Sequence, residues 1–107
     1  MKFGLKEHTI EEIREVFAAH SRIEKAILYG SRAKGNYKTG SDIDIVLLAP
    51  DITLTELFRI ENQLDDLLLP WKIDLSLFHQ ISNPDLIEHI SRVGIVLYER
   101  GNSLSVS

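Results

Sequence analysis

The chain has 107 residues, of which 44% are hydrophobic and 26% charged, and its formal net charge is −4. This length suits a single domain, and the acidic balance argues against an extended groove for DNA or RNA, which would gain affinity by neutralising phosphates. No apolar run reaches the roughly 18 residues of a membrane-spanning helix. The absence of cysteine excludes disulfides and thiolate metal sites.

The first half of the chain predicts a helix, two strands and a short helix between the strands. Thr9 and Glu12 form a capping box, and the apolar spacing behind them predicts a helix over 10–20. The β-prone run 25–30 ends at a glycine and predicts the first strand. The run 43–49 is almost continuously apolar, which is typical of a strand covered on both faces.

The second half predicts two more helices and two more strands. Thr53 begins a second capping box, and apolar residues at intervals of three or four predict an amphipathic helix to about Leu69. Alternating apolar and polar residues predict a strand over 71–78. The Asn-Pro pair at 83–84 predicts a helix through about Ser91, and the run IVLYE predicts the last strand.

This order of elements predicts an α/β (α+β) fold, in which helices pack against a sheet. We expect a single domain over 1–107, with an ordered core at about 9–99. The tail 100–107 is polar and rich in small residues, so we expect it to be flexible. The lack of a signal-peptide pattern and of cysteine suits a cytoplasmic protein.

Three aspartates occupy unusual positions in the predicted strands. Asp42 and Asp44 are two residues apart at a strand start, so their side chains point to the same side. Carboxylates this close repel one another unless a cation lies between them, and Mg²⁺ is the usual cation for an all-carboxylate site. Asp74 can join them if the two strands are neighbours. Taken singly, each aspartate also fits a turn, a cap or a solvated strand face.

A glycine-serine pair ends the first predicted strand. Gly30 would let phosphate oxygens approach the backbone, and Ser31 offers a hydroxyl and an N–H at the start of a short helix, whose positive end favours anions. Arg32 and Lys34 are cations in the same segment, either available for triphosphate charge or simply solvated. By itself, the pair is also compatible with a plain strand-ending turn.

Other residues that often carry chemistry are not assigned to the site. The four histidines show no ligand spacing, and each is expected to be at the surface or half-buried: His8, His20, His79 and His89. Trp71 is expected to pack between the preceding helix and the sheet, with stacking on a base as the alternative.

The combined pattern is far more specific than its parts. Gly30-Ser31, ten intervening residues and then Asp42-x-Asp44 resemble the signature of the DNA polymerase β nucleotidyltransferase superfamily. The stretches GSRAKG, SDIDI and PWKIDLS are similar to those of the minimal nucleotidyltransferases, and the resemblance covers roughly residues 9–99. It implies the nucleotidyltransferase fold, a small mixed sheet with helices packed against it and the site at one strand end.

The resemblance also implies a role for each motif residue. Asp42, Asp44 and Asp74 would hold two divalent ions, Mg²⁺ or Mn²⁺, while Gly30 and Ser31 would hold the β- and γ-phosphates of a nucleotide. Asp74 would also take the proton from the attacking hydroxyl. The implied reaction is nucleotidyl transfer, with AMP from ATP passing to an acceptor hydroxyl and pyrophosphate leaving.

The small size restricts the acceptor, because the catalytic fold uses up about 100 residues. The acceptor must be a partner protein, a second copy of the chain in a homo-oligomer, or something very small. Minimal nucleotidyltransferases commonly accompany a small all-helical HEPN-type toxin or a related substrate-binding protein. As antitoxins, some transfer AMP onto a toxin tyrosine, which is the leading expectation here. The alternatives are transfer to a small molecule and a non-catalytic module that neutralises a helical partner by contact.

Overall fold

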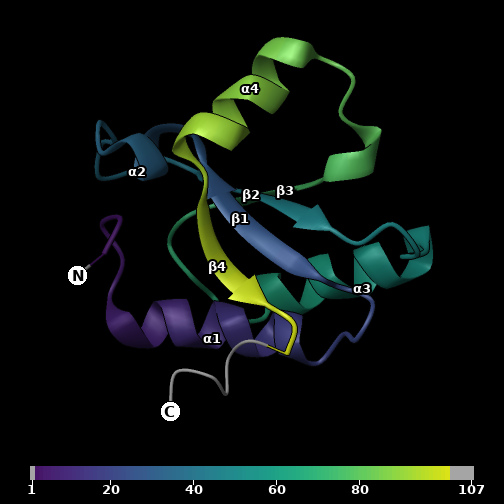
Figure 1. The fold of residues 1–107 in the computed structure, drawn as a ribbon. Coiled ribbons are helices and arrows are strands. Elements are labelled where there is room, and N and C mark those ends of the chain that lie inside the picture. Colours follow the sequence, from purple (N-terminus) through teal and green to yellow (C-terminus); the bar gives the residue numbers. More distant parts are fainter. Residues whose placement is uncertain (1, 102–107) are drawn as a thin grey trace.

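A four-stranded sheet with helices on both faces makes up the computed structural model, which describes residues 2–101 (Figure 1). In chain order the elements are α1 (Glu7–Ala18), β1 (Lys25–Tyr29), α2 (Gly30–Lys34), β2 (Ile43–Leu48), α3 (Leu54–Asp65), β3 (Ile73–Leu77), the 3₁₀ turn η1 (Phe78–Gln80), α4 (Pro84–Val93) and β4 (Ile95–Glu99). The predicted order of helices and strands is confirmed.

The sheet is mixed, with the strand order β3-β2-β1-β4. β1 is antiparallel to both of its neighbours, β2 and β4, whereas β2 and β3 run parallel. The end of β1 therefore lies beside the starts of β2 and β3. This arrangement brings the Gly-Ser turn and the aspartates to one end of the sheet, as predicted.

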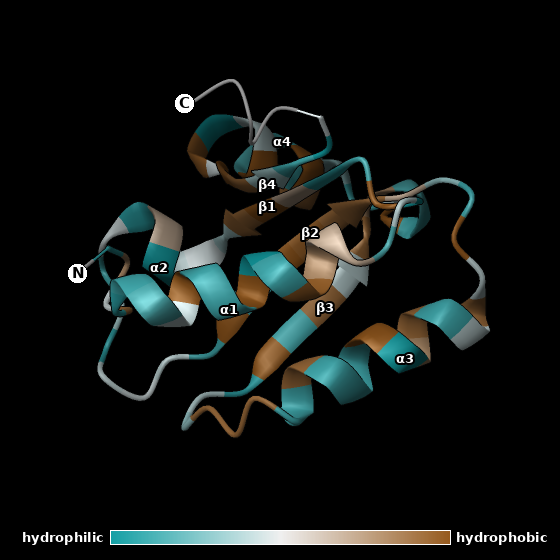
Figure 2. Ribbon diagram, turned by 90° about the horizontal axis from the view of Figure 1, so that it is seen from below, coloured by the Kyte–Doolittle hydropathy of each residue, from teal (hydrophilic) through white to brown (hydrophobic). Residues whose placement is uncertain are grey.

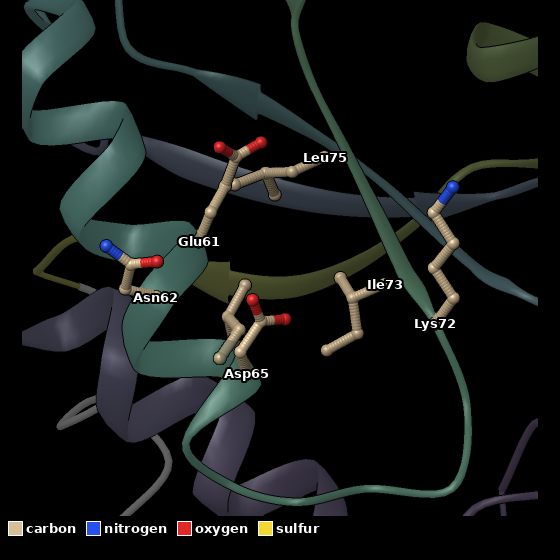
Figure 3. Close-up of a pocket in the computed structure, with 7 residues that line it drawn as sticks. Glu61, Asn62, Asp65, Lys72, Ile73 and Leu75 are labelled. Atoms are coloured by element: carbon tan, nitrogen blue, oxygen red, sulfur yellow. The ribbon is translucent and has the colours of Figure 1, made fainter.

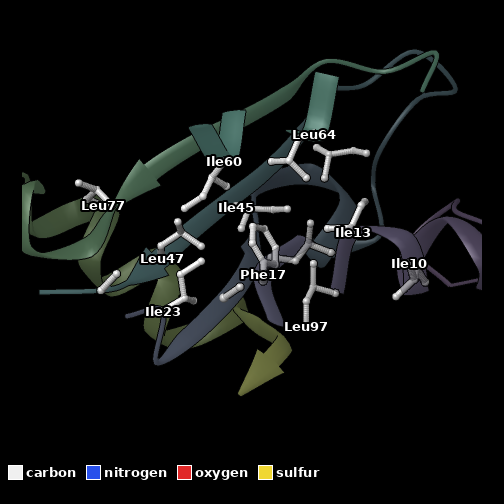
Figure 4. Close-up of a cluster of buried hydrophobic side chains, with 14 of the residues drawn as sticks. Ile10, Ile13, Phe17, Ile23, Ile45, Leu47, Ile60, Leu64, Leu77 and Leu97 are labelled. Carbon is white, nitrogen blue, oxygen red and sulfur yellow. The ribbon is translucent and has the colours of Figure 1, made fainter. Parts of the chain in front are cut away.

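Helices α1 and α3 cover one face of the sheet, and α4 lies on the other (Figure 1). Figure 2 shows hydrophilic residues on the outward sides of α1 and α3 and hydrophobic residues along the strands behind them. Alternate residues of β2 point into the core under α1 and α3, where Ile45 and Leu47 pack with Phe17, Ile60 and Leu64 (Figure 4). The continuous apolar run of β2 is explained by burial on both sides.

A smaller apolar cluster lies under α4. It joins Tyr29 of β1, Val46 of β2 and Ile90 of α4. None of the helices within residues 2–101 has the length and apolar character needed to cross a membrane.

Two predicted helix boundaries were wrong. α1 begins at Glu7 and is preceded by Lys6 without a side-chain cap, so Thr9 is buried inside the helix and forms no capping box. The fully buried Leu5 anchors the chain ahead of the helix. Residues before the expected core boundary are thus part of the packed structure.

The end of α3 also differs from the prediction. Thr53 caps the helix as expected, because its hydroxyl accepts a hydrogen bond from the N–H of Glu56 at 3.1 Å. The helix ends at Asp65 rather than near Leu69, since Leu68 has a φ of 56° and is exposed. The apolar spacing continued past the residue at which the backbone leaves the helix.

The predicted flexible tail begins with a residue that is held in place. The N–H of Arg100 donates to the carbonyl of Glu24 at 2.9 Å, and its guanidinium donates to the carbonyl of Ser21 at 2.7 Å. The rest of the predicted tail, residues 102–107, lies outside the described residues.

Candidate active site

A row of polar side chains crosses three strands at the end of the sheet that carries the motifs. Asp44 of β2 is paired with Tyr29 of β1 on one side and with Asp74 of β3 on the other. Strand alternation places these residues on the α4 face, the side on which Tyr29 and Val46 pack. The two strands are neighbours, which was the condition for Asp74 to join the other aspartates. Asp42, two residues before Asp44, is exposed in the loop that enters β2.

The electrostatics of Asp44 reflect these neighbours. The pKa of its carboxyl is raised, first by burial and then by the like charges of Asp74 and Asp42, while His89 acts in the opposite direction. The negative charges of Asp42 and Asp74 thus act on Asp44. Across residues 2–101, however, no three acidic or histidine side chains are gathered tightly enough to hold a metal ion together. Joint metal binding by Asp42, Asp44 and Asp74 stays a prediction.

Glycine is the only residue type that fits position 30, at the junction between β1 and α2. Its φ is +77°, a region that disfavours side chains, and a Cβ built on it would collide with the Oδ2 of Asp44. The glycine therefore lets the turn pack directly against the aspartate. Ser31 follows at the start of α2 and is partly exposed.

His89 of α4 also reaches this junction, although the sequence analysis excluded it from the site. Its Nε2 accepts a hydrogen bond from the N–H of Gly30 at 3.1 Å, and its ring meets the ring of Tyr29 edge-on at 6.2 Å between centroids. The pKa of Tyr29 is raised, mainly by burial, with Asp44 adding to the effect. His89 and Tyr29 thus form part of the surroundings of Asp44.

The prediction that Arg32 contacts phosphates, or is solvated, is contradicted by its burial. Only 2% of the residue is exposed, and its guanidinium donates to the carbonyls of Phe3, Thr39 and Ser41. These contacts use the donors that a triphosphate would need. Lys34, in contrast, is exposed on α2, and no ion pair ties it to another described residue.

An open pocket of about 250 Å³ lies between α3 and β3 (Figure 3). Its lining residues are Glu61, Asn62, Leu64, Asp65, Lys72, Ile73 and Leu75. Ile73 and Leu75 alternate with Asp74 along β3 and so face the opposite side of the sheet. The pocket contains none of the predicted site residues.

Comparison with known proteins shows which protein family has this sequence and fold. The sequence model of the family described as "Polymerase beta, Nucleotidyltransferase" matches residues 11–103. The chain belongs to the polymerase β nucleotidyltransferase family. A relative from Methanocaldococcus jannaschii, named "Putative protein adenylyltransferase MJ1217", is 37% identical over 84 residues, covering 71% of this chain and 85% of that protein.

Solved structures share the nucleotidyltransferase fold. A toxin–antitoxin structure with AMP-PNP matches with a TM-score of 0.67 and 22% identity, over 95% of this chain and 80% of that one. A tri-AMPylated Shewanella oneidensis HEPN toxin in complex with its MNT antitoxin gives a TM-score of 0.65 and 18% identity, over 95% and 79%. A nucleotidyltransferase structure from Sulfolobus solfataricus matches with a TM-score of 0.53 and 17% identity, over 85% and 77%.

Nucleotidyltransferases of this family generally use divalent metals, and the residues of this site suit such ions. The donor set consists of carboxylates, which Mg²⁺ and Mn²⁺ prefer. Burial first, and then the like charges of Asp74 and Asp42, raise the pKa of Asp44, and a bound cation would relieve the repulsion between these charges. The site chemistry therefore fits the metals that the family uses.

The sequence contains a weak indication that His89, which was not assigned to the site, faces the sheet. His89 lies three residues after Leu86 and four before Val93, so helical spacing places it on the stripe that faces the sheet. That spacing shows which way the side chain points. It contains no information that α4 crosses above the Gly30 junction.

Proposed function

We propose that this nucleotidyltransferase transfers AMP from ATP to a hydroxyl of a partner protein, with Mg²⁺ or Mn²⁺ at the carboxylates. The observation that carries the proposal is the in-register pair Asp44 and Asp74 beside the Gly30–Ser31 turn. The partner would be a small all-helical HEPN-type toxin, neutralised by the modification. This would make the chain the antitoxin of a two-component module.

Each residue of the site would have a distinct task. The Gly30–Ser31 turn would hold the β- and γ-phosphates through the backbone and the serine hydroxyl, and exposed Lys34 is free to neutralise triphosphate charge. Asp42, Asp44 and Asp74 would hold two divalent ions. When bound, such ions neutralise the triphosphate and orient it for in-line attack.

At the α-phosphorus, the transfer forms one bond and breaks one. The acceptor oxygen bonds to the α-phosphorus, the bond between that phosphorus and the bridging oxygen breaks, and pyrophosphate leaves with the electron pair. Asp74 would take the hydroxyl proton. Its exposure at the sheet edge leaves it accessible to an acceptor that arrives from outside the chain.

The relatives support the choice of nucleotide and acceptor. One similar structure is a toxin–antitoxin with the ATP analogue AMP-PNP, and another contains a HEPN toxin that carries AMP groups. The relative from Methanocaldococcus jannaschii is named as a protein adenylyltransferase.

The proposal is tested by following a radiolabelled α-phosphate from ATP. The purified chain is incubated with Mg²⁺, labelled ATP and, as the candidate acceptor, a purified small all-helical HEPN-type protein. Label should appear on that protein with the parent chain and disappear with Asp44→Asn, whereas Asp51→Asn, at an exposed turn away from the site, should label normally. Equal labelling by Asp44→Asn would show that another residue or another enzyme performs the transfer.

Nucleotide binding can be measured without the partner. A ligand at about 100 times its Kd stabilises the native state by about 2.7 kcal/mol, so saturating Mg·ATP should raise the unfolding midpoint by several degrees. An unchanged midpoint would remove the basis for the site assignment. Neutralisation of the toxin without labelling would instead favour inhibition by contact.

A further inference from the structure

Arg32 is a buried charge at the centre of an unusual set of contacts. Burial lowers the pKa of its guanidinium, since a charge removed from water must be compensated by other interactions. No carboxylate among residues 2–101 forms an ion pair with it. Its compensation comes from backbone carbonyls and aromatic rings.

The carbonyls come from two separate segments of the chain. Nε and Nη2 both donate to the carbonyl of Ser41, at 3.1 and 2.8 Å, and Nη2 also lies 3.4 Å from the carbonyl of Thr39. Nη1 donates to the carbonyl of Phe3 at 2.8 Å. The N-terminal segment accordingly runs beside α2, as Figure 1 shows.

Two aromatic rings complete the surroundings of the guanidinium. Its central carbon lies 5.2 Å from the ring centroid of Tyr37 and 5.3 Å from that of Trp71, distances suited to cation–π attraction. The indole N–H of Trp71 donates to the carbonyl of Thr39 at 2.9 Å. Trp71 therefore holds the same loop as Arg32, instead of only packing between α3 and the sheet as predicted.

These contacts join the three parts of the candidate site. Arg32 directly follows Ser31 in the chain, and its main acceptor, Ser41, directly precedes Asp42. Trp71 lies three residues before Asp74, at the entrance to β3. Ser41 and Trp71 are thus within three residues of a predicted metal ligand, whereas Phe3 belongs to the N-terminal segment.

The loop between the two motifs has few hydrogen bonds of its own, among them two between Lys38 and Ser41 at 2.8 and 3.0 Å. Residues 33–40 include Gly35 and Gly40, and a Cβ on either glycine would meet no other atom within 4 Å. Glycines in open surroundings leave a loop with many accessible conformations. The pairing of Tyr29 with Asp44 fixes the two ends of this segment in the sheet, and the contacts of Arg32 restrict the residues between them.

We propose that Arg32 is a positioning residue, which holds the Asp42 segment against the Gly30–Ser31 turn so that the carboxylates can bind metal. This role rests on the proposed function. It requires an arginine, because two donors of the planar guanidinium bind one carbonyl while its central carbon lies over both neighbouring rings. A lysine would keep the charge but offer only a point-like ammonium.

The test measures Mn²⁺ binding directly, through loss of the free-ion electron paramagnetic resonance signal. The variants are Arg32→Lys, Trp71→Phe and the reference Asp44→Asn. The matched control is Arg14→Lys, since Arg14 also donates to a carbonyl, that of Leu97, at 2.6 Å but far from the site. Circular dichroism first locates each unfolding midpoint, and binding is measured well below it, so that loss of fold does not enter the comparison.

Arg32→Lys should weaken Mn²⁺ binding about tenfold or more, as the loss of outer partners of metal ligands commonly does. Trp71→Phe keeps a ring beside Arg32 but loses the N–H, so it should weaken binding about threefold. Arg14→Lys should bind like the parent. If Arg32→Lys does not fold, the Mn²⁺ affinity of Trp71→Phe tests the positioning role instead.

Two failures can be told apart. If Asp44→Asn loses Mn²⁺ binding while Arg32→Lys and Trp71→Phe bind like Arg14→Lys, the positioning role is overturned and the proposed function stands. If the parent binds no Mn²⁺, or Asp44→Asn binds as tightly as the parent, the metal site itself is wrong and the proposed function falls together with the inference.

Discussion

Asp44→Asn should stabilise the metal-free protein while it removes the proposed activity. In EDTA, Asp44 is a partly buried carboxylate in register with Asp74 and two residues from Asp42. Burial and both like charges raise its pKa. Asparagine has nearly the same shape and no charge, so the substitution removes the repulsion with little change in packing.

The magnitude follows from the strand geometry. Side chains of paired residues on neighbouring strands are separated by about 5–6 Å. Asp74 is exposed, so an effective dielectric constant between about 40 and 80 is appropriate, which gives a repulsion of about 0.7–1.4 kcal/mol at 6 Å. For a domain of this size, the unfolding midpoint should rise by about 3–10 °C.

The pH dependence provides an independent check of the same cause. Because the folded-state pKa of Asp44 is raised, its charged form destabilises the protein at pH 7, and protonation relieves this as the pH falls through that raised pKa. The parent should gain stability relative to Asp44→Asn as the pH is lowered. The difference in unfolding midpoint between Asp44→Asn and the parent should therefore be smaller at pH 5 than at pH 7.

The assay is thermal unfolding of the parent, Asp44→Asn and the exposed control Asp51→Asn, each in EDTA at pH 7 and pH 5. The control should stay within about 0.5 kcal/mol of the parent. A lower midpoint for Asp44→Asn at pH 7 would refute the reasoning, because it would mean that the charged aspartate supports the fold.

Two further substitutions test the junction at Gly30. Gly30→Ala should destabilise by about 2–4 kcal/mol, through its positive φ and the collision with Asp44, whereas Gly35→Ala, with a positive φ in open space, should lose about 1–2 kcal/mol; equal losses in chemical denaturation would exclude the close packing. His89→Phe should speed hydrogen exchange of the Gly30 amide and cost about 1 kcal/mol, since the acceptor is lost. His89→Gln, which can keep an acceptor there, should recover part of both effects, and identical behaviour of the two variants would count against the hydrogen bond.

Local patterns in the sequence were sufficient for several elements of the fold and the site. The unbroken apolar run of β2 had to be covered on both faces. That Asp42 and Asp44 share a side stays a prediction, because Asp42 lies in the loop before the strand. Thr53 was identifiable as a cap because its partner lies only three residues away. In each case the interacting groups are neighbours in the chain.

Tertiary structure decided what depends on distant segments. Only the parallel pairing of β2 and β3 places Asp74 beside Asp44, and only the crossing of α4 brings His89 to the amide of Gly30. Arg32 was expected to contact phosphate because its charge is visible in the sequence, whereas the carbonyls and rings that bury it are assembled by the fold. Sequence spacing specifies the direction of a side chain on its own element, but its partners depend on which elements pack together.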